Sequence, residues 1–210
     1  MIDIHTLKVE GIPEALHGMR NPKDSWNLSD TELNRETEAG CWIGENDWKL
    51  ALQLSSGGSV HAKYRRMIFV WADITAPLYW WKEFDTYKVG TVANSTSTMH
   101  KIQAKEFSRE DFSCDRLTPD ALSVLDSMIE YLEGERIKFV ETKEKSHWHN
   151  MIQLLPSSFN QMRTVSMNYE VLINIYYARR YHKLAEWHVL CEAIEKLPYA
   201  DKLILVKGDK

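Results

Sequence analysis

Amide, guanidinium and imidazole side chains gather near bulky aromatic residues in the last third of the chain. Asn168, Asn174 and Arg179 occur in this order, and Arg180 and His182 follow. The fixed fork of donors in an arginine can hold a carboxylate, a phosphate or a pyrimidine carbonyl. These residues therefore indicate a binding site for a small ligand, although a solvated helix face would explain any one of them alone.

A second candidate is the polar segment 86–98, which is rich in Ser, Thr and Asn. Hydroxyl and amide donors, together with backbone N–H groups near a helix end, make a suitable cradle for a phosphate. Lys88 and Lys101 would add positive charge to it. The alternative is a polar surface loop whose side chains cap neighbouring helices.

Histidines offer a third pattern, because His182 and Glu186 stand at a helical spacing that suits metal ligands, and His147 and His149 lie close in sequence. No complete ligand set has a recognised spacing, so we expect no metal site. The chain also lacks the glycine-rich dinucleotide fingerprint, the phosphate loop and the nucleophile elbow. No residue is assigned as catalytic.

The elements ahead of the polar segment would position it. The composition of residues 66–75 predicts a strand, with Ile68, Val70, Ala72 and Ile74 on one face. A helix is expected to begin at Pro77 and to run through the aromatic residues up to position 84. Earlier, apolar spacing predicts a helix over 47–54 that the adjacent glycines at 57 and 58 terminate, and a short helix is expected after 29–32.

The second half of the chain reads as mainly helical. Residues 118–120 resemble a helix start, and the apolar spacing predicts a helix over at least 121–131. The charged stretch 141–145 indicates an exposed connection. Apolar positions recur at helical intervals over 165–197, which predicts one long or kinked helix, and the polar segment 86–98 is expected to be a loop.

Composition limits the class of protein. A chain of 210 residues suits one well-buried domain. Its 26 basic and 30 acidic residues are intermixed and give a net charge of -4, which argues against binding long nucleic acid. The three cysteines are far apart, so a reducing cytoplasm is expected. No apolar run approaches the roughly 20 residues that cross a bilayer, and we expect no membrane association.

Aromatic residues are numerous, with 8 Trp and 9 Tyr, and several of them cluster. Clustered rings suit a stacked planar ligand or a subunit interface. Ordinary core packing explains most of them. A separate alternative for the whole chain is a structural protein whose aromatic residues serve only an interface.

The order of these segments resembles that of the flavin-dependent thymidylate synthases. The family's lead-in is similar to Ala76-Pro77-Leu78-Tyr79, and the loop signature Arg-His-Arg-x-x-Ser-x-Asn-x-x-Ser-x-Arg would fall on the polar segment 86–98. With one inserted residue, Asn94 and Ser97 match its later Asn and Ser. The resemblance covers roughly residues 59–195, and residues 1–58 agree with the family only loosely.

The later part of the chain carries the closer resemblance. The family has, in order, a Leu-Pro pair, two flavin-contacting asparagines, a nucleotide-contacting arginine and an Ala-Gln-Trp motif. This chain resembles that series in order and nearly in spacing, with Leu155-Pro156, Asn168, Asn174, Arg179 and Ala185-Glu186-Trp187.

The chain departs from the family at charged positions. Thr86 and Tyr87 stand in place of the Arg-His pair, and Met99 stands in place of the last arginine of the signature. Ile152 and Glu170 occupy two further arginine positions, whereas Lys88 keeps one charge. Each lost charge-assisted contact would cost on the order of 1.5–3 kcal/mol. Candidates to compensate are Lys63, Arg65, Arg66 and Arg163.

The resemblance implies a single α/β domain over residues 1–210, with a twisted antiparallel sheet and packed helices, in a homotetramer. It implies conversion of dUMP to dTMP with FAD, NADPH and methylenetetrahydrofolate. The implied cofactor-binding residues are His61, Tyr87, Lys88, Asn168 and Asn174. The implied substrate-binding residues are Asn94, Ser95, Thr96, Ser97 and Arg179. The main alternative is a non-catalytic or re-purposed nucleotide-binding homologue that keeps the oligomeric scaffold.

Overall fold

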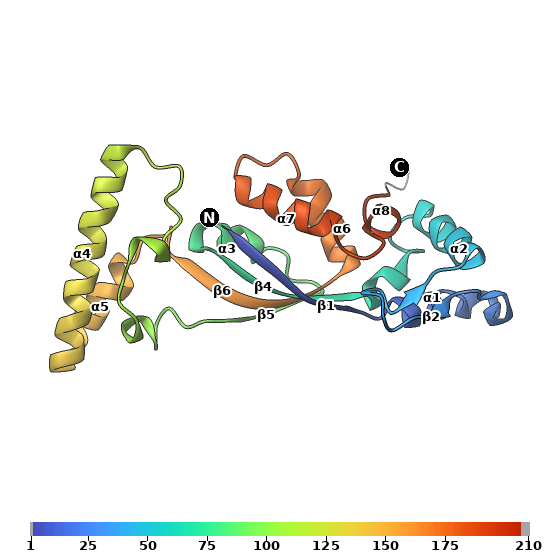
Figure 1. The fold of residues 1–210 in the computed structure, drawn as a ribbon, viewed down its shortest axis with the longest axis horizontal. Coiled ribbons are helices and arrows are strands. Elements are labelled where there is room, and N and C mark those ends of the chain that lie inside the picture. The colour runs from blue at the N-terminus through green and yellow to red at the C-terminus, as the bar shows by residue number, and fades with distance from the viewer. Residues whose placement is uncertain (1, 207–210) are drawn as a thin grey trace. The chain divides into compact units, whose positions relative to one another are not determined.

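The computed structural model describes residues 2–206. Its larger sheet has four strands in the order β1-β4-β6-β5, which are β1 (Asp3–Glu10), β4 (Phe69–Pro77), β6 (Asn160–Asn168) and β5 (Thr91–Ser95) (Figure 1). Strands β4 and β6 are antiparallel, because the N–H of Leu78 donates to the carbonyl of Phe159 at one end and that of Tyr169 to the carbonyl of Ile68 at the other, both at 3.0 Å. The predicted α/β class with an antiparallel sheet and packed helices is confirmed.

The chain forms two compact units. The first comprises Met1–Asp3, Ile74–Thr86 and Asn94–Arg163, and the second comprises Ile4–Asp73, Tyr87–Ala93 and Thr164–Lys210. Strands β4, β5 and β6 therefore each contribute residues to both units.

The first unit holds α3 (Leu78–Phe84), α4 (Pro119–Thr142) and α5 (Lys145–Leu154), and α4 lies beside α5 (Figure 1). Helix α4 begins as the sequence predicts, since the Thr118 hydroxyl accepts a hydrogen bond from the N–H of Ala121 at 3.4 Å. A buried apolar cluster fills the unit, with Ile102, Phe107, Phe112, Leu125, Leu132 and Met151 at its centre. Burial of these side chains holds the two helices together.

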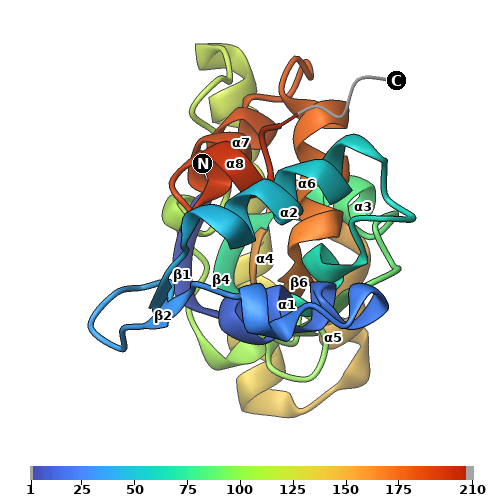
Figure 2. The same cartoon turned by 90° about the vertical axis from the view of Figure 1, so that its right-hand side faces the viewer.

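The second unit contains α1 (Ile12–Met19), α2 (Glu45–Ser56), α6 (Tyr169–Arg179), α7 (Ala185–Glu195) and α8 (Ala200–Leu203) (Figure 2). It also holds the short strands β2 (Glu32–Leu33) and β3 (Cys41–Trp42). A buried ion pair fixes α2, because Asp47 Oδ1 accepts from Arg20 Nε at 2.6 Å while Oδ2 accepts from the hydroxyls of Ser29 and Thr31. Both partners of the pair are almost fully buried.

Short 3₁₀ helices complete the two units. The second unit has η1 (Asn21–Lys23), η2 (Trp26–Leu28) and η3 (Lys63–Met67). The first has η4 (Ile102–Ala104) and η5 (Arg109–Asp111).

Several expected elements are present where the sequence places them. Strand β4 buries Val70, Ala72 and Ile74 on one face, and α2 covers the helix expected at 47–54. Helix α3 follows β4 directly, with Pro77 at its N-cap. These elements were predictable because their burial and their local propensities agree.

Three expectations about secondary structure are wrong. Residues 165–197 do not form one helix, because residues up to Asn168 belong to β6, and α6 and α7 follow as separate helices. Buried Val165 and Met167 alternate as in a strand, and Asn168 caps α6. The polar segment 86–98 contains β5, which is mostly exposed and has no apolar pattern. The helix expected after 29–32 is instead strand β2, paired with β3.

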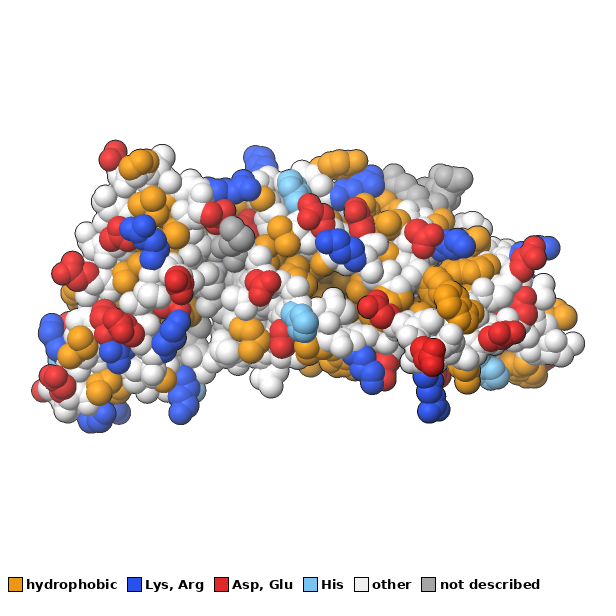
Figure 3. Space-filling view, in the orientation of Figure 1, with side chains coloured by type: hydrophobic (Ala, Val, Ile, Leu, Met, Phe, Trp, Pro, Cys, Tyr) orange, Lys and Arg blue, Asp and Glu red, His pale blue; other side chains and the backbone are white. Residues whose placement is uncertain are grey.

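The described surface carries both signs of charge. On the face displayed in Figure 3, Lys and Arg side chains are interspersed with Asp and Glu side chains. Among the described helices, none has both the length and the apolar character that crossing a lipid bilayer requires.

Candidate functional site

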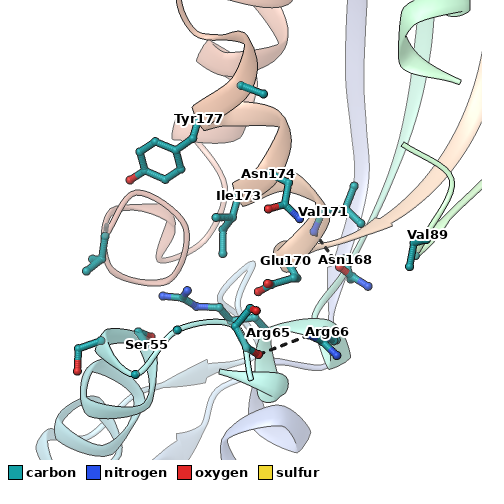
Figure 4. A pocket seen from close by; sticks show the side chains of 17 residues that line it. Ser55, Arg65, Arg66, Val89, Asn168, Glu170, Val171, Ile173, Asn174 and Tyr177 are labelled. Carbon is teal, nitrogen blue, oxygen red and sulfur yellow. Dashed lines mark hydrogen bonds between the residues drawn. The ribbon is translucent and has the colours of Figure 1, made fainter. Parts of the chain in front are cut away.

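A pocket of about 1350 Å³ lies within the second unit (Figure 4). Four segments and Val206 line it: the end of α2 with the glycines that follow it, the arginines of η3, the turn before β5, and one side of α6. Its lining includes Ser55, Gly57, Gly58, Arg65, Arg66, Val89, Gly90, Asn168, Glu170, Asn174 and Tyr177. These residues come from parts of the chain more than a hundred positions apart, so the pocket depends on the tertiary fold.

Helix α6 presents both polar and apolar side chains to the pocket. Glu170, Asn174 and Tyr177 recur at helical spacing and all line it. The helix is held at its start, where Asn168 accepts a hydrogen bond from the N–H of Val171 at 3.0 Å through Oδ1. Tyr169 is fully buried and donates its hydroxyl proton to the carbonyl of Pro198 at 2.7 Å. Burial raises the pKa of Tyr169, so its hydroxyl remains a donor at neutral pH.

The side chain of Asn168 is tightly confined. It is only 8 % exposed, and a Cβ atom added to Gly90 would lie 2.7 Å from its Nδ2. Gly90 has a positive φ of 77°, a conformation that favours glycine. The turn before β5 can therefore approach α6 closely only with glycine at this position. Because Oδ1 caps the helix, Nδ2 is the group with which Asn168 can donate to a ligand.

Two arginines from η3 bring positive charge to the pocket. Arg65 is 5 % exposed, and its Nε and Nη2 atoms have no hydrogen-bond partner among the described residues. In Figure 4 its guanidinium points into the space below Ile173 and Tyr177. Arg66 is exposed, and its Nη2 donates to the carbonyl of Ser59 at 3.5 Å. An arginine keeps its charge even when buried, so the Arg65 donors call for an anionic partner.

The η3 segment is anchored to α2. The hydroxyl of buried Tyr64 donates to the carbonyl of Ala51 at 3.1 Å and lies 2.9 Å from the hydroxyl of Ser55. His61 packs beside Gly57, which directly follows α2, since a Cβ atom added to Gly57 would lie 2.9 Å from the His61 ring. His61 is exposed and adjoins a lining residue without lining the pocket itself.

The structure brings some of the residues expected to bind the cofactor together. Asn168 and Asn174 line the same pocket, and Lys88 is exposed beside Val89, which lines it. Tyr87 lies with a residue expected to bind the substrate, because Arg179 Nε donates to its hydroxyl at 2.8 Å. The Arg179 guanidinium also lies 4.7 Å from the centre of the Trp187 ring. Neither Tyr87 nor Arg179 is among the described residues that line the pocket.

The other residues expected to bind the substrate, Asn94, Ser95, Thr96 and Ser97, belong to the first unit and are exposed. The N–H of Thr96 donates to the carbonyl of Met162 at 2.9 Å. The hydroxyl of Ser97 accepts from the N–H of His100 at 2.8 Å, which forms a local turn. The turn at Ser97 fits the alternative of a polar surface segment, and a role in phosphate binding stays a prediction.

The sequence pattern does not predict the α2 end of the pocket, and it indicates Arg65 and Arg66 only as possible compensating charges. The one local signal was a pair of adjacent arginines directly before a buried strand. Burial of the first one follows from the packing of η3, which the sequence pattern does not encode. Among the described residues, no cluster of three or more His, Cys, Asp or Glu side chains could hold a metal ion.

Comparisons with known proteins identify the fold. No protein-family model matches the sequence, and no curated protein matches it. Two solved structures of thymidylate synthase X from Helicobacter pylori with FAD and dUMP are similar, each with 17% sequence identity. The first has a TM-score of 0.70 and covers 98% of both chains, and the second has a TM-score of 0.69 and covers 97% of this chain and 98% of that chain.

A third similar structure is the UMP/dUMP methylase PolB from Streptomyces cacaoi bound with 5-Br dUMP. It has a TM-score of 0.60 and 13% identity, and the match covers 93% of this chain and 88% of that one. The chain therefore has the fold of these nucleotide-methylating proteins over nearly its full length.

Proposed function

We propose that this protein binds FAD in the pocket at the start of α6 and methylates dUMP to dTMP, with NADPH and methylenetetrahydrofolate as co-substrates. The observation that carries the proposal is the meeting of Asn168 and Asn174 in one large pocket. The resemblance of the sequence assigns flavin contacts to both asparagines. Independent support is the shared fold with proteins whose solved structures contain FAD and dUMP.

The residues of the pocket fit a flavin dinucleotide. Its volume of about 1350 Å³ exceeds the roughly 300–1,000 Å³ of ordinary small-molecule sites, so it has room for a long ligand. Asn168 and Asn174 offer amide groups for the polar edge of a ring system, and Val171 and Ile173 offer apolar contact. The unpartnered donors of Arg65 suit the diphosphate.

FAD in this pocket would supply the hydride chemistry, and this chain would supply binding and orientation. Asn168 would donate to the cofactor through Nδ2, while its Oδ1 stays on the helix cap. His61, Tyr87 and Lys88 are further proposed cofactor contacts. Arg179, held against Tyr87 and Trp187, is proposed to bind the nucleotide.

The phosphate of the nucleotide is proposed to bind to Asn94, Ser95, Thr96 and Ser97. A homotetramer and a cytoplasmic location belong to the same proposal.

A second candidate function is nucleotide binding without turnover. It is favoured by one observation, the replacement of charged positions of the signature by Thr86, Tyr87 and Met99. A re-purposed homologue of this kind would keep a pocket for a nucleotide and would not form dTMP.

Purified protein separates the two candidates. The enzyme is expected to show flavin absorbance near about 450 nm, or to acquire it after incubation with FAD. With dUMP, NADPH and methylenetetrahydrofolate it is then expected to form dTMP, detected by chromatography. Colourless protein that cannot be reconstituted with FAD contradicts the flavoenzyme. Nucleotide-dependent thermal stabilisation of such protein would support the re-purposed homologue.

A further inference from the structure

We infer that the guanidinium of Arg65 binds a phosphoryl group of the ligand in the pocket at the start of α6. The inference deepens the proposed function, on which it rests for the identity of the ligand. It assigns the phosphate contact to a residue of η3, outside the polar segment 86–98.

Burial of Arg65 without partners is the main observation. The residue is 5 % exposed, and two of its nitrogen atoms, Nε and Nη2, have no hydrogen-bond partner within residues 2–206. These two atoms lie on one side of the guanidinium and form a fork that matches two oxygens of a phosphoryl group. The guanidinium cannot lose its proton to escape the cost of burial. A buried charge of this kind is stable only with an anion or a polar ligand beside it.

The direction of the side chain supports a ligand contact. Arg65 lines the pocket and points into the space below Ile173 and Tyr177 (Figure 4). Its nearest aromatic partner is Tyr64, whose ring centre lies 6.0 Å from the guanidinium carbon, at the outer limit of a cation–π contact. That contact leaves the in-plane donors of the guanidinium unused.

The charged residues of the lining carry a net positive charge, which favours binding of an anion. Arg66 adds a second positive charge, and Glu170 is a carboxylate on the α6 side. Within the described residues, no ion pair joins Glu170 to either arginine. The lining thus has two guanidinium groups and one carboxylate, and an added phosphoryl group would balance it.

Two sources could supply the phosphoryl group, namely the diphosphate of FAD and the monophosphate of dUMP. Both share the chemistry that Arg65 recognises, and the dephosphorylated compounds riboflavin and deoxyuridine separate them. Inorganic pyrophosphate serves as a third probe, because it needs neither a flavin nor a pyrimidine site.

The decisive variant is Arg65→Met, which keeps much of the side-chain volume and removes the charge. A buried guanidinium whose anionic ligand is absent destabilises the ligand-free protein. We therefore expect Arg65→Met to raise the melting temperature of the ligand-free protein. The same variant is expected to lower the affinity for the phosphorylated ligand at least tenfold. The control is Arg35→Met, which removes the same charge from an exposed position of the same unit.

Calorimetric titration and thermal shift give the readouts. A loss of affinity for FAD but not for riboflavin assigns the FAD diphosphate to Arg65, and a loss for dUMP but not for deoxyuridine assigns the nucleotide. Pyrophosphate is expected to stabilise the wild type and Arg35→Met, but not Arg65→Met. If no flavin binds and pyrophosphate still acts through Arg65, the inference stands and the proposed function fails.

The opposite results overturn the inference. They are equal affinity of the wild type and Arg65→Met for FAD and for dUMP, or a wild type that binds none of the phosphorylated probes. An Arg65→Met protein that is less stable than the wild type without ligand also overturns it, because Arg65 would then have a structural role. Binding of FAD that does not depend on Arg65 leaves the proposed function intact.

Discussion

At the scale of single residues, the pocket depends on how closely Gly90 approaches Asn168. Gly90 and Gly58 both line the pocket and both have positive φ, 77° and 85°. A Cβ atom at Gly58 would meet nothing within 4 Å, whereas one at Gly90 would lie 2.7 Å from Asn168 Nδ2. Substitution of Gly58 therefore tests the effect of backbone conformation alone, whereas substitution of Gly90 tests backbone conformation and steric contact together.

Gly90→Ala is expected to destabilise the protein more than Gly58→Ala does. Both alanines carry a left-handed backbone penalty of about 1–2 kcal/mol. The Gly90 variant adds a clash that displaces the Asn168 cap, which costs about 1–3 kcal/mol more. Urea denaturation followed by circular dichroism measures the difference. Equal losses in the two variants would show that the close approach to Asn168 does not matter.

Some site residues could be predicted from the sequence, and others could not. Asn168 and Asn174 are predicted as ligand contacts because amides at these spacings near aromatic residues resemble a known pattern, and both line the pocket. Their contact with a flavin stays a prediction. No such pattern marks Arg65, because its proposed role depends on burial and on the lack of a hydrogen-bond partner in the described part of the chain. Burial of that kind results from the packing of distant segments.

At the scale of elements, helices α4 and α5 share a buried carboxylate. Glu135 of α4 accepts hydrogen bonds from Lys138 of the same helix and from His147 and Asn150 of α5, at 2.7 to 2.9 Å. Hydrogen bonds from His147, Lys138 and Asn150 lower the pKa of Glu135 to about 2, whereas desolvation opposes the shift. The pair of helices is thus held by a group that must be ionised.

Acid should weaken this link. The pKa of Glu135 is about 2 in the folded protein, below its ordinary value of 4.5. Its stabilising contribution is therefore complete above about pH 4.5 and is lost as the pH falls toward about 2. We expect Glu135→Gln to reduce the free energy of unfolding by about 1–3 kcal/mol at pH 7, because donors lose their charged acceptor. The deficit is expected to shrink between pH 4.5 and pH 2.

Urea denaturation at a series of pH values tests the prediction. Glu130→Gln is the matched control, because Glu130 is exposed on the same helix. A constant difference between the wild type and Glu135→Gln across this range would contradict the ionised link.

Elements whose local propensity agreed with their burial were predicted well, such as β4 and the start of α4. Two segments failed for a physical reason. Strand β5 is mostly exposed and polar, so its pairing partner in the sheet, not its own pattern, makes it a strand. The boundary between β6 and α6 was missed because apolar residues on both sides of Asn168 fall at spacings that also suit a helix.

At the scale of the whole molecule, a common fold coexists with altered charges. The similar solved structures extend over nearly the whole chain at 13–17% identity. A fold tolerates such divergence when its core residues keep their volume and pattern. Function depends on individual site residues, and several charged positions of the signature are replaced here. Ligand binding is therefore the property that decides what this chain does.

The most direct measurement is an equilibrium titration of the protein with FAD, followed by flavin fluorescence, for the wild type, Asn174→Ala and the control Asn27→Ala. Asn27 is exposed in η2 of the same unit and lies outside the pocket. We predict saturable binding to the wild type, an affinity about fivefold lower for Asn174→Ala through loss of one neutral hydrogen bond, and no change for Asn27→Ala. Absence of saturable binding to the wild type, or identical affinities for all three proteins, would contradict a flavin site at the start of α6.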